Sequence, residues 1–345
     1  MWDVAIVGAG PVGLFAAWSL AGRGARVAVF EAYDEVPTEN RAATIHSSTL
    51  SILDDTGLID EVLARGLRAD VFQWRDFVSA EIVAEYDFGL LADECPYPFA
   101  VQLEQHKLVN LIRRRLAGNR FVTYHGNCTV QRFTELDDRV IVDARDATGN
   151  VQCEARYLIG CDGARSLVRK SIGVEFEGYT FDEKFSVVTV QHDFAESMGF
   201  RVRNYLSDVD CWFGIFKVPG HDDEGVWRTT YPLKQELSTD RATAEAEVAA
   251  VYRRYLPAAV GAPITQVNTY NVHQRVAARF RRGRAMLAGD SAHVNNPLGG
   301  LGLNSGIHDA ANLADKLSRV LAGEPNTLLD LYDRQRRGPA VQYVQ

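Results

Sequence analysis

The 345-residue chain has few cysteines and no recognisable pattern of metal ligands. Its five cysteines are odd in number and include no Cys-x-x-Cys pair, which fits a reducing compartment better than a secreted disulfide framework. No two of the eight histidines have the spacing that a metal site requires. We therefore expect no bound metal and a cytoplasmic location.

The chain also lacks an excess of positive charge and a long hydrophobic run. Its formal net charge is −8, whereas proteins that bind nucleic acid need a basic surface for the phosphates. The longest apolar stretch, residues 11–21, is too short to span a bilayer, and no basic leader precedes an apolar segment at the N-terminus. We therefore expect no nucleic-acid binding, no membrane span and no signal peptide.

A glycine-rich motif near the start predicts a dinucleotide-binding βαβ unit. A short apolar strand leads into Gly8-Ala-Gly10-Pro-Val12-Gly13, and an apolar helix follows. Gly8 permits the tight turn, Gly10 lets a pyrophosphate approach the backbone, and Gly13 lets the helix pack closely on the sheet. Glu31 ends the next strand, where it can accept hydrogen bonds from ribose hydroxyls and would repel a 2′-phosphate. This motif by itself leaves NAD and FAD both open.

Three further candidates stand in the middle of the chain. Arg41 is either a surface cation or a group that faces the phosphates or the ring edge of the cofactor. Gln102 stands just before a helix whose apolar residues recur at helical spacing. Asp162 ends an apolar strand and begins an Asp-Gly turn before a short basic helix. Open parallel sheets bind ligands at the carboxyl ends of their strands, so the position of Asp162 favours a ligand edge.

A second glycine cluster returns late in the chain. Gly289-Asp290 follows a buried strand, and a carboxylate there can bind a ribityl or ribose hydroxyl. Three glycines then lead into a helix over residues 304–321, whose positive N-terminus suits an anionic reduced flavin. The two ends of the chain together indicate one long cofactor held at both extremities, and FAD is of that kind. The expected contacts at this end are Asp290, Gly300, Leu301, Gly302, Leu303 and Asn304.

Residues from about 175 to 271 differ in kind from the rest. They form short, aromatic-rich, strand-like runs separated by turns, which predict an antiparallel sheet that walls an apolar pocket. For each candidate on this wall, packing in the core or at an edge competes with substrate contact. The candidates are His192, Tyr205, Trp212, Arg228 and Tyr231.

These motifs resemble those of the group A flavoprotein monooxygenases, the aromatic-ring hydroxylases with the p-hydroxybenzoate hydroxylase fold. The resemblance covers nearly the whole chain. Arg41 and Gln102 fall where that family places residues that contact FAD. The matching motifs are Gly8-x-Gly10-x-x-Gly13 with Glu31 for ADP, Asp162-Gly163 for FAD and reduced nicotinamide, and Gly289-Asp290-x-Ala292-His293 with Pro297 for the ribityl or ribose part of FAD.

The resemblance implies an α/β fold in which a Rossmann-like FAD-binding domain of the glutathione-reductase type is interleaved with an antiparallel-sheet substrate domain. We assign residues 1–70, 100–175 and 272–322 to the FAD-binding domain, 71–99 and 176–271 to the substrate-binding domain, and 323–345 to a C-terminal helical segment. Relatives usually continue by a helix or a whole domain, and whether this chain is truncated does not follow from the sequence. A homodimer is a possible assembly.

The resemblance also implies a reaction. NADH or NADPH reduces FAD, oxygen adds to the reduced flavin, and the resulting C4a-hydroperoxide hydroxylates a phenolic or hydroxylated N-heteroaromatic ring. A base that deprotonates a ring hydroxyl would make the ring more nucleophilic. His46 is the candidate base because it follows Arg41 on the segment expected near the flavin. Pro297 is expected beside the ring, and Arg228 is expected to hold a carboxylate.

Two other interpretations stay open. One is a flavoprotein of another reaction type, such as a halogenase or an FAD-dependent reductase or oxidase. Halogenases of this fold carry a W-x-W-x-I-P motif, which Cys211-Trp-Phe-Gly-Ile215 does not supply. The other is a non-catalytic flavin-binding protein, which is disfavoured because all three cofactor motifs are intact. Neither the aromatic substrate nor the choice between NADH and NADPH follows from the sequence.

Overall fold

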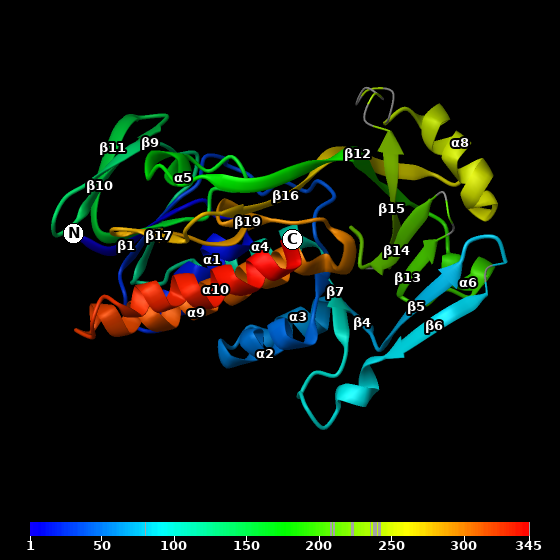
Figure 1. Cartoon of the computed structure of the whole chain (residues 1–345), viewed down its shortest axis with the longest axis horizontal. Helices are drawn as coiled ribbons and strands as arrows, with labels where there is room; N and C mark the ends of the chain where they lie inside the picture. The colour runs from blue at the N-terminus through cyan, green and yellow to red at the C-terminus, as the bar shows by residue number, and fades with distance from the viewer. Residues whose placement is uncertain are drawn as a thin grey trace.

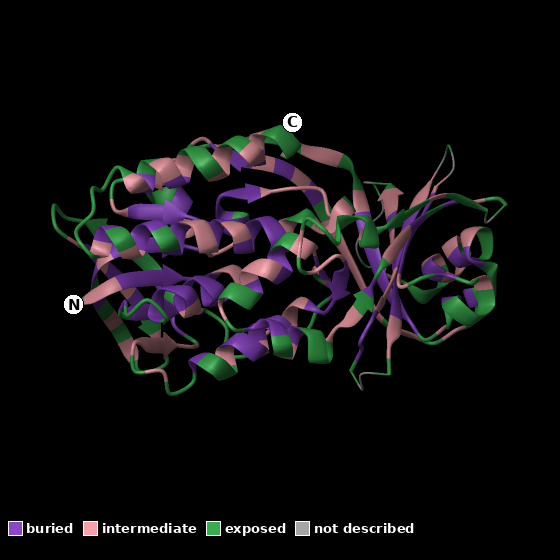
Figure 2. Ribbon diagram, turned by 90° about the horizontal axis from the view of Figure 1, so that it is seen from below, coloured by how far each residue is buried: buried purple, intermediate pink, exposed green. Residues whose placement is uncertain are grey.

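The chain has a mixed α/β fold with two large sheets, as the α/β prediction required. The computed structural model describes residues 1–79, 81–207, 209, 211–221, 224–234, 236, 240 and 243–344. One sheet lies in the half of the molecule that contains the N-terminus, and the other lies in the opposite half (Figure 1). Each half has its own buried hydrophobic cluster, and buried residues are concentrated in both (Figure 2).

The first sheet is built on parallel strands. Central β1 (Trp2–Val7) pairs in parallel with β2 (Val27–Phe30) on one side and with β11 (Gly149–Gly160) on the other. The carboxyl ends of parallel strands meet at one edge, so Gly8, Glu31 and Asp162 are brought together there. The other strands are β8 (Val122–His125), β9 (Thr129–Glu135), β10 (Val140–Asp146), β17 (Arg281–Arg282) and β18 (Ala285–Leu287).

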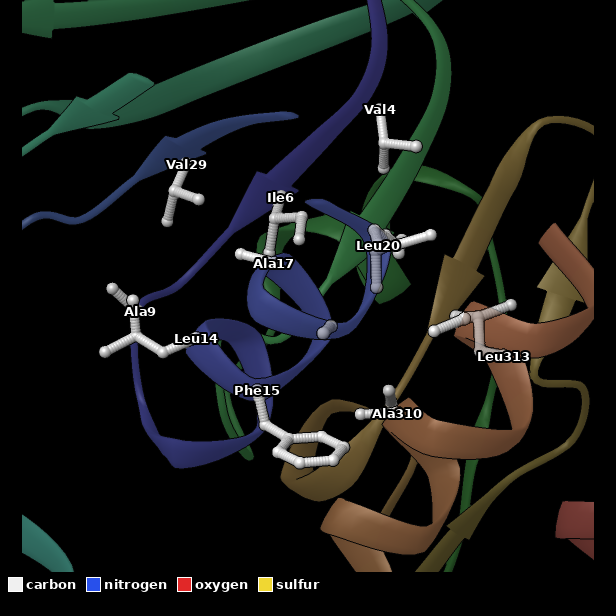
Figure 3. Packing of buried hydrophobic residues seen from close by; sticks show 14 of the residues in the cluster. Val4, Ile6, Ala9, Leu14, Phe15, Ala17, Leu20, Val29, Ala310 and Leu313 are labelled. Atoms are coloured by element: carbon white, nitrogen blue, oxygen red, sulfur yellow. The ribbon is translucent and has the colours of Figure 1, made fainter. Parts of the chain in front are cut away.

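Helix α1 (Pro11–Ala21) is buried between this sheet and α9 (Leu301–Leu321). Pro11 stands in the first turn, where its missing N–H removes no helical hydrogen bond. Figure 3 shows Phe15 and Leu20 of the helix among side chains of β1, β2 and α9. Full burial of a side chain of this kind contributes about 1.5–3 kcal/mol, so this packing fixes the glycine-rich turn that precedes α1.

The second sheet is antiparallel in all but one of its pairings. Its strand order is β19-β16-β12-β15-β14-β13-β5-β6, and only β13 pairs in parallel with its neighbour β5. The antiparallel sheet expected for residues 175–271 is therefore present, and Val71–Asp76 and Ile82–Asp87 form its edge. Its strands are β5 (Val71–Asp76), β6 (Ile82–Asp87), β12 (Phe176–Val190), β13 (Arg203–Ser207), β14 (Trp212–Val218), β15 (Val226–Lys234), β16 (Ile264–Ala277) and β19 (His293–Val294).

The C-terminal part of the chain consists mainly of two long helices. Helix α9 begins at Leu301, three residues before the expected start, because Gly300 already supplies its N-cap. Helix α10 (Leu328–Val344) packs along α9 and continues through Pro339. Across the described ranges, no helix combines the length and the hydrophobicity needed to cross a membrane.

The remaining elements connect the two halves or cover their surfaces. They are the small sheet of β3 (Thr44–Ile45), β7 (Ala100–Gln102) and β4 (Leu67–Ala69), with helices α2 (Ser47–Asp55), α3 (Ile59–Arg65), α4 (Gln105–Leu116), α5 (Leu167–Ser171), α6 (Phe194–Met198) and α8 (Glu245–Tyr255).

Candidate active site

One cavity of ≈ 940 Å³ is lined by loops of the first sheet and by strands of the second. This volume lies near the upper end of the range for small-molecule sites. At one end the wall is formed by residues 8–12 and Glu31. At the other end it is formed by β13, β14 and β16, which contribute Tyr205, Trp212 and Tyr270. We call these the motif end and the aromatic end.

Most of the residues predicted from the sequence face this cavity. Gly13, His46, Leu301 and Asn304 are not among the residues that line it. The predicted residues that do line it are Gly8, Gly10, Val12, Glu31, Arg41, Gln102, Asp162, Arg228, Asp290, Pro297, Gly300, Gly302 and Leu303.

The glycine-rich turn has the shape that a pyrophosphate requires. Gly8 has a φ of +97°, and a Cβ there would lie 2.3 Å from the Cys161 carbonyl oxygen. A Cβ on Gly13 would lie 2.0 Å from the Gly8 oxygen, so Gly13 serves the packing of α1 beneath the turn. At Gly10 a Cβ would meet no atom of the described residues within 4 Å, although this residue lines the cavity. The fold therefore does not need glycine at this position, whereas a phosphate close to the backbone does.

The carboxylate of Glu31 is held against the same turn. Its Oε2 accepts a hydrogen bond of 2.7 Å from the backbone N–H of Ala9, and its Oε1 accepts one of 3.0 Å from Tyr33. These bonds fix a negative charge at the end of β2, next to the motif end of the cavity. This placement suits ribose hydroxyls, which can donate to a carboxylate oxygen that still has a free lone pair.

The carboxylate of Asp162 forms hydrogen bonds within its own Asp-Gly motif and with the Gly-Asp motif at residues 289–293. Its Oδ2 caps α5 by accepting from the backbone N–H groups of Leu167 (2.6 Å) and Val168 (3.1 Å). Its Oδ1 accepts from the hydroxyls of Ser166 (2.6 Å) and Ser291 (3.1 Å). Because Ser291 lies directly after Asp290, Asp162 helps to place the second carboxylate. A direct contact between Asp162 and a cofactor stays a prediction.

Gln102 and Asp290 present polar groups to the cavity between its two ends. Gln102 is fully buried, and its Oε1 accepts from the Thr44 hydroxyl, but its Nε2 has no partner among the described residues. A buried donor without a partner is costly unless a ligand satisfies it. Desolvation raises the pKa of Asp290, and the nearby His293 and Arg41 oppose this rise. The glycine turn, Glu31 and these two side chains together fit FAD.

His46 lies behind the wall of the cavity. Its Nε2 is 2.7 Å from the Gly299 carbonyl oxygen, which can only accept, so Nε2 carries the proton. Its backbone N–H donates to Oδ1 of Asn304. Burial, followed by the positive charge of Arg203, lowers the pKa of His46 to about 4. His46 is thus neutral at physiological pH and is held in the wall, while its role as a base stays a prediction.

The depressed pKa of His46 predicts a loss of stability in acid. The folded state disfavours the protonated ring, so the stability linked to His46 is present above its ordinary pKa of 6.5 and falls as the pH decreases towards about 4. We expect the free energy of unfolding to drop less steeply over this pH window in His46→Gln than in the unmodified protein. Urea titrations at a series of pH values measure this, and parallel curves for the two proteins would contradict it.

The two other predicted catalytic residues lie at the aromatic end. Pro297 lines the cavity just before the turn that leads into α9. Arg228 is only 8% exposed, and its Nη1 donates to the Arg41 carbonyl oxygen at 3.2 Å. Its Nε has no partner among the described residues. Burial lowers the pKa of Arg228, and Glu104 opposes this effect.

The cavity wall also contains residues that the motifs did not reveal. Asn268 and Tyr270 face it from β16, and Arg113 and Tyr124 face it at the motif end. The alternation of side chains along β16 could have placed Asn268 and Tyr270 on one face, but only once the strand and its register were known.

Comparison with known proteins identifies the family. The family model described as "FAD binding domain" matches residues 1–345. The chain is 35% identical over 348 residues to a para-nitrophenol 4-monooxygenase of Pseudomonas sp. (strain WBC-3), with 99% of this chain and 84% of the relative covered. It is 31% identical to a 6-hydroxy-3-succinoylpyridine 3-monooxygenase of Pseudomonas putida, with 99% and 86% covered.

A solved structure agrees with these sequence matches. The crystal structure of a p-nitrophenol 4-monooxygenase from Pseudomonas putida matches with a TM-score of 0.90 and 34% identity, covering 100% of this chain and 86% of that one. Both the family model and the relatives therefore point to the same cofactor and reaction type. The chain belongs to the group A FAD-dependent monooxygenases, the aromatic-hydroxylase family of flavoprotein oxidoreductases.

Proposed function

We propose that this flavoprotein uses NADH or NADPH and oxygen to hydroxylate a phenolic or hydroxylated N-heteroaromatic substrate at the aromatic end of the cavity. The observation that carries this proposal is a cavity whose lining includes both the nucleotide-binding turn and a wall of aromatic side chains. The named substrates of two relatives, a nitrophenol and a hydroxypyridine, are both hydroxylated aromatic rings.

We propose that the two halves of the molecule bind different ligands. Residues 1–70, 100–175 and 272–322 would form the Rossmann-like FAD-binding domain, and residues 71–99 and 176–271 the substrate domain. In support, β5, β6 and β12 to β15 all belong to the second sheet. The boundary at residue 272 falls within β16, so the two parts share a strand instead of meeting at a linker.

In this proposal the cofactor lies along the predicted motifs. The glycine turn and the N-terminus of α1 would hold the pyrophosphate, and Glu31 would hold the adenosine ribose. Arg41, Gln102 and Asp290 would bind the middle of the cofactor. The flavin would lie beside the N-terminus of α9, with Gly300, Leu301, Gly302, Leu303 and Asn304 in that turn. The positive end of a helix stabilises negative charge on a reduced flavin.

When bound and reduced, FAD supplies the oxygen-activating chemistry of the family. The chain itself would orient the ring and exclude water with the aromatic wall. The guanidinium of Arg228 would attract an anionic group of the substrate, such as a carboxylate or a phenolate. A buried positive charge also lowers the pKa of a neighbouring phenol, which makes the ring more electron-rich without a dedicated base.

The proposed reaction is tested by following NADH and NADPH oxidation by the FAD-loaded protein with a panel of phenols and hydroxypyridines. We expect at least one compound to stimulate oxidation and to gain one oxygen atom, detected by mass spectrometry. Oxidation of NAD(P)H that no aromatic compound stimulates, without a hydroxylated product, would instead favour a reductase or oxidase.

Replacing Arg228 with methionine tests its role in substrate binding. We expect KM for an anionic ring compound to rise roughly 10- to 100-fold, because charge-assisted hydrogen bonds contribute about 1.5–3 kcal/mol. KM for a neutral phenol should change little, and Arg228→Lys should recover part of the loss because it keeps the charge. Steady-state kinetics with both compounds measure this. An equal rise of KM for both would show that Arg228 merely shapes the wall.

A further inference from the structure

The turn that precedes α9 is held by side chains from both halves of the molecule. Gly299 and Gly300 have φ values of 83° and 71°, in the left-handed region that favours glycine. The N–H of Gly299 donates to the Tyr205 hydroxyl oxygen at 3.0 Å. Its carbonyl oxygen accepts from Nε2 of His46 at 2.7 Å. The two peptide groups that flank Gly299 are thus fixed from β13 of the second sheet on one side and from the segment before α2 on the other.

A buried cation lies behind the Tyr205 hydroxyl. Arg203 is 3% exposed, its charge lies close enough to interact with the Tyr205 hydroxyl, and its Nε has no partner in the described part of the chain. The rings of Phe72 and Phe88 lie 5.6 Å and 6.0 Å from the guanidinium. A buried charge is costly unless polar groups lie near it, so the Tyr205 hydroxyl is favoured at a position close to the guanidinium.

The ring of Tyr205 belongs to the aromatic end of the cavity. It makes an edge contact with Phe216 at 5.4 Å between ring centroids, and both residues line the cavity. Trp74 lies against it at 5.7 Å. A planar molecule bound at this wall would therefore touch the same side chain that holds the Gly299 N–H.

We propose that Tyr205, supported by Arg203, positions the Gly299–Gly300 turn and the N-terminus of α9 from the second sheet. A ligand at the aromatic end would thereby shift the turn at the cofactor end through the Tyr205 hydroxyl. Binding can move an equilibrium only through contacts that differ between two states, and in this proposal the Tyr205–Gly299 hydrogen bond is that contact. Tyr205 is thus a positioning residue for the cofactor end of the site.

Hydrogen exchange tests the positioning on the protein alone. In Tyr205→Phe we expect the backbone amide of Gly299 to exchange roughly tenfold faster, as for loss of one hydrogen bond. Tyr231→Phe is the matched control, because Tyr231 is buried on β15, stacks on Phe213 and does not line the cavity. If Tyr205→Phe fails to fold, Arg203→Met provides the same test, with a smaller increase expected. Unchanged exchange of Gly299 in the folded variant would overturn the proposal.

The effect of a bound ligand shows whether the Tyr205–Gly299 hydrogen bond transmits ligand binding to the turn or only stabilises the fold. Saturating 4-nitrophenol should change Gly299 exchange in the FAD-loaded unmodified protein and in Tyr231→Phe, but not in Tyr205→Phe. The reduction potential of bound FAD should shift with the same ligand in the first two proteins only. A ligand response that survives in Tyr205→Phe would overturn the link. These measurements need ligand binding at the aromatic end, which rests on the proposed function. They do not need hydroxylation, so a failure of the proposed reaction can be distinguished from a failure of the proposed role of Tyr205.

Discussion

Gly10→Ala is expected to lower the affinity for FAD by roughly 100-fold, or about 2.7 kcal/mol, while the apoprotein keeps its thermal stability. The backbone of Gly10 has a φ of −65°, which any residue can adopt. No described protein atom lies within 4 Å of the Cβ that alanine would add. The added methyl group would instead occupy the space that the pyrophosphate needs when it approaches the turn.

Two other glycines serve as controls for Gly10→Ala. Gly338 in α10 lies outside the cavity and also has room for a Cβ beyond its chain neighbours, so Gly338→Ala should leave FAD affinity unchanged. Gly13→Ala should impair folding itself, since its Cβ would lie 2.0 Å from a backbone oxygen. Fluorescence titration of the apoproteins with FAD and thermal unfolding measure both quantities. If Gly10→Ala binds FAD as tightly as the unmodified protein, the pyrophosphate does not lie against this turn.

Asp309→Ala is expected to reduce the free energy of unfolding by about 3–5 kcal/mol, because it leaves buried partners uncompensated. Asp309 is fully buried on α9, where one carboxylate oxygen lies 2.7 Å from Nε2 of His293 and the other 2.6 Å from Nε of Arg336. The first oxygen also accepts the backbone N–H of Gly289 at 3.0 Å. Removal of the carboxylate therefore loosens α10 and the segment that carries Asp290 together.

Asp315→Ala is the matched control on the same helix. Its carboxylate is 52% exposed and lies 3.9 Å from Arg319, so its loss should change the free energy of unfolding by less than about 0.5 kcal/mol. Urea unfolding of both apoproteins at neutral pH provides the comparison. A similar small effect for the two variants would mean that the buried network is not important for stability.

The loss of unfolding free energy caused by Asp309→Ala should be the same throughout the neutral pH range. Burial alone would raise the pKa of Asp309, but His293 and Arg336 outweigh it and keep the pKa below its ordinary value of 3.8. The stability contributed by this carboxylate is therefore present above 3.8 and is lost only as the pH falls through the depressed value. The difference between Asp309→Ala and the unmodified protein should thus shrink only in strong acid.

The local geometry of the glycine-rich segment was predictable from the sequence because it depends on nearby residues. A tight turn at Gly8, a close helix at Gly13 and an acid at the end of the next strand each depend on neighbours within one βαβ unit. The helix after Gly300 was also predictable from its local glycine cluster, although the prediction placed its first turn three residues too late. Local rules fix which residues can form a turn, but they fix a helix start only approximately.

The links between distant segments were not predictable in this way. Ser291 donates to Asp162 across 129 positions, and Gly299 donates to Tyr205 across 94. Neither pair has a local signature, since serine, tyrosine and glycine occur in many settings. The parallel pairing of β13 with β5 likewise joins strands far apart in the chain. Such contacts depend on how the two sheets meet, which no single segment determines.

The long strands β12 and β16, of 15 and 14 residues, run from the first half of the molecule into the second (Figure 1). They pair with each other from Phe176 and Ala277 to Val190 and Ile264, on both sides of an irregularity between Thr180 and Lys184. Two paired strands that cross between the halves resist a hinge motion that would open the cavity by swinging the halves apart. A substrate should therefore reach the aromatic end without a separation of the two halves. Only a small part of the site should move when it enters: a turn, a side chain or the cofactor itself.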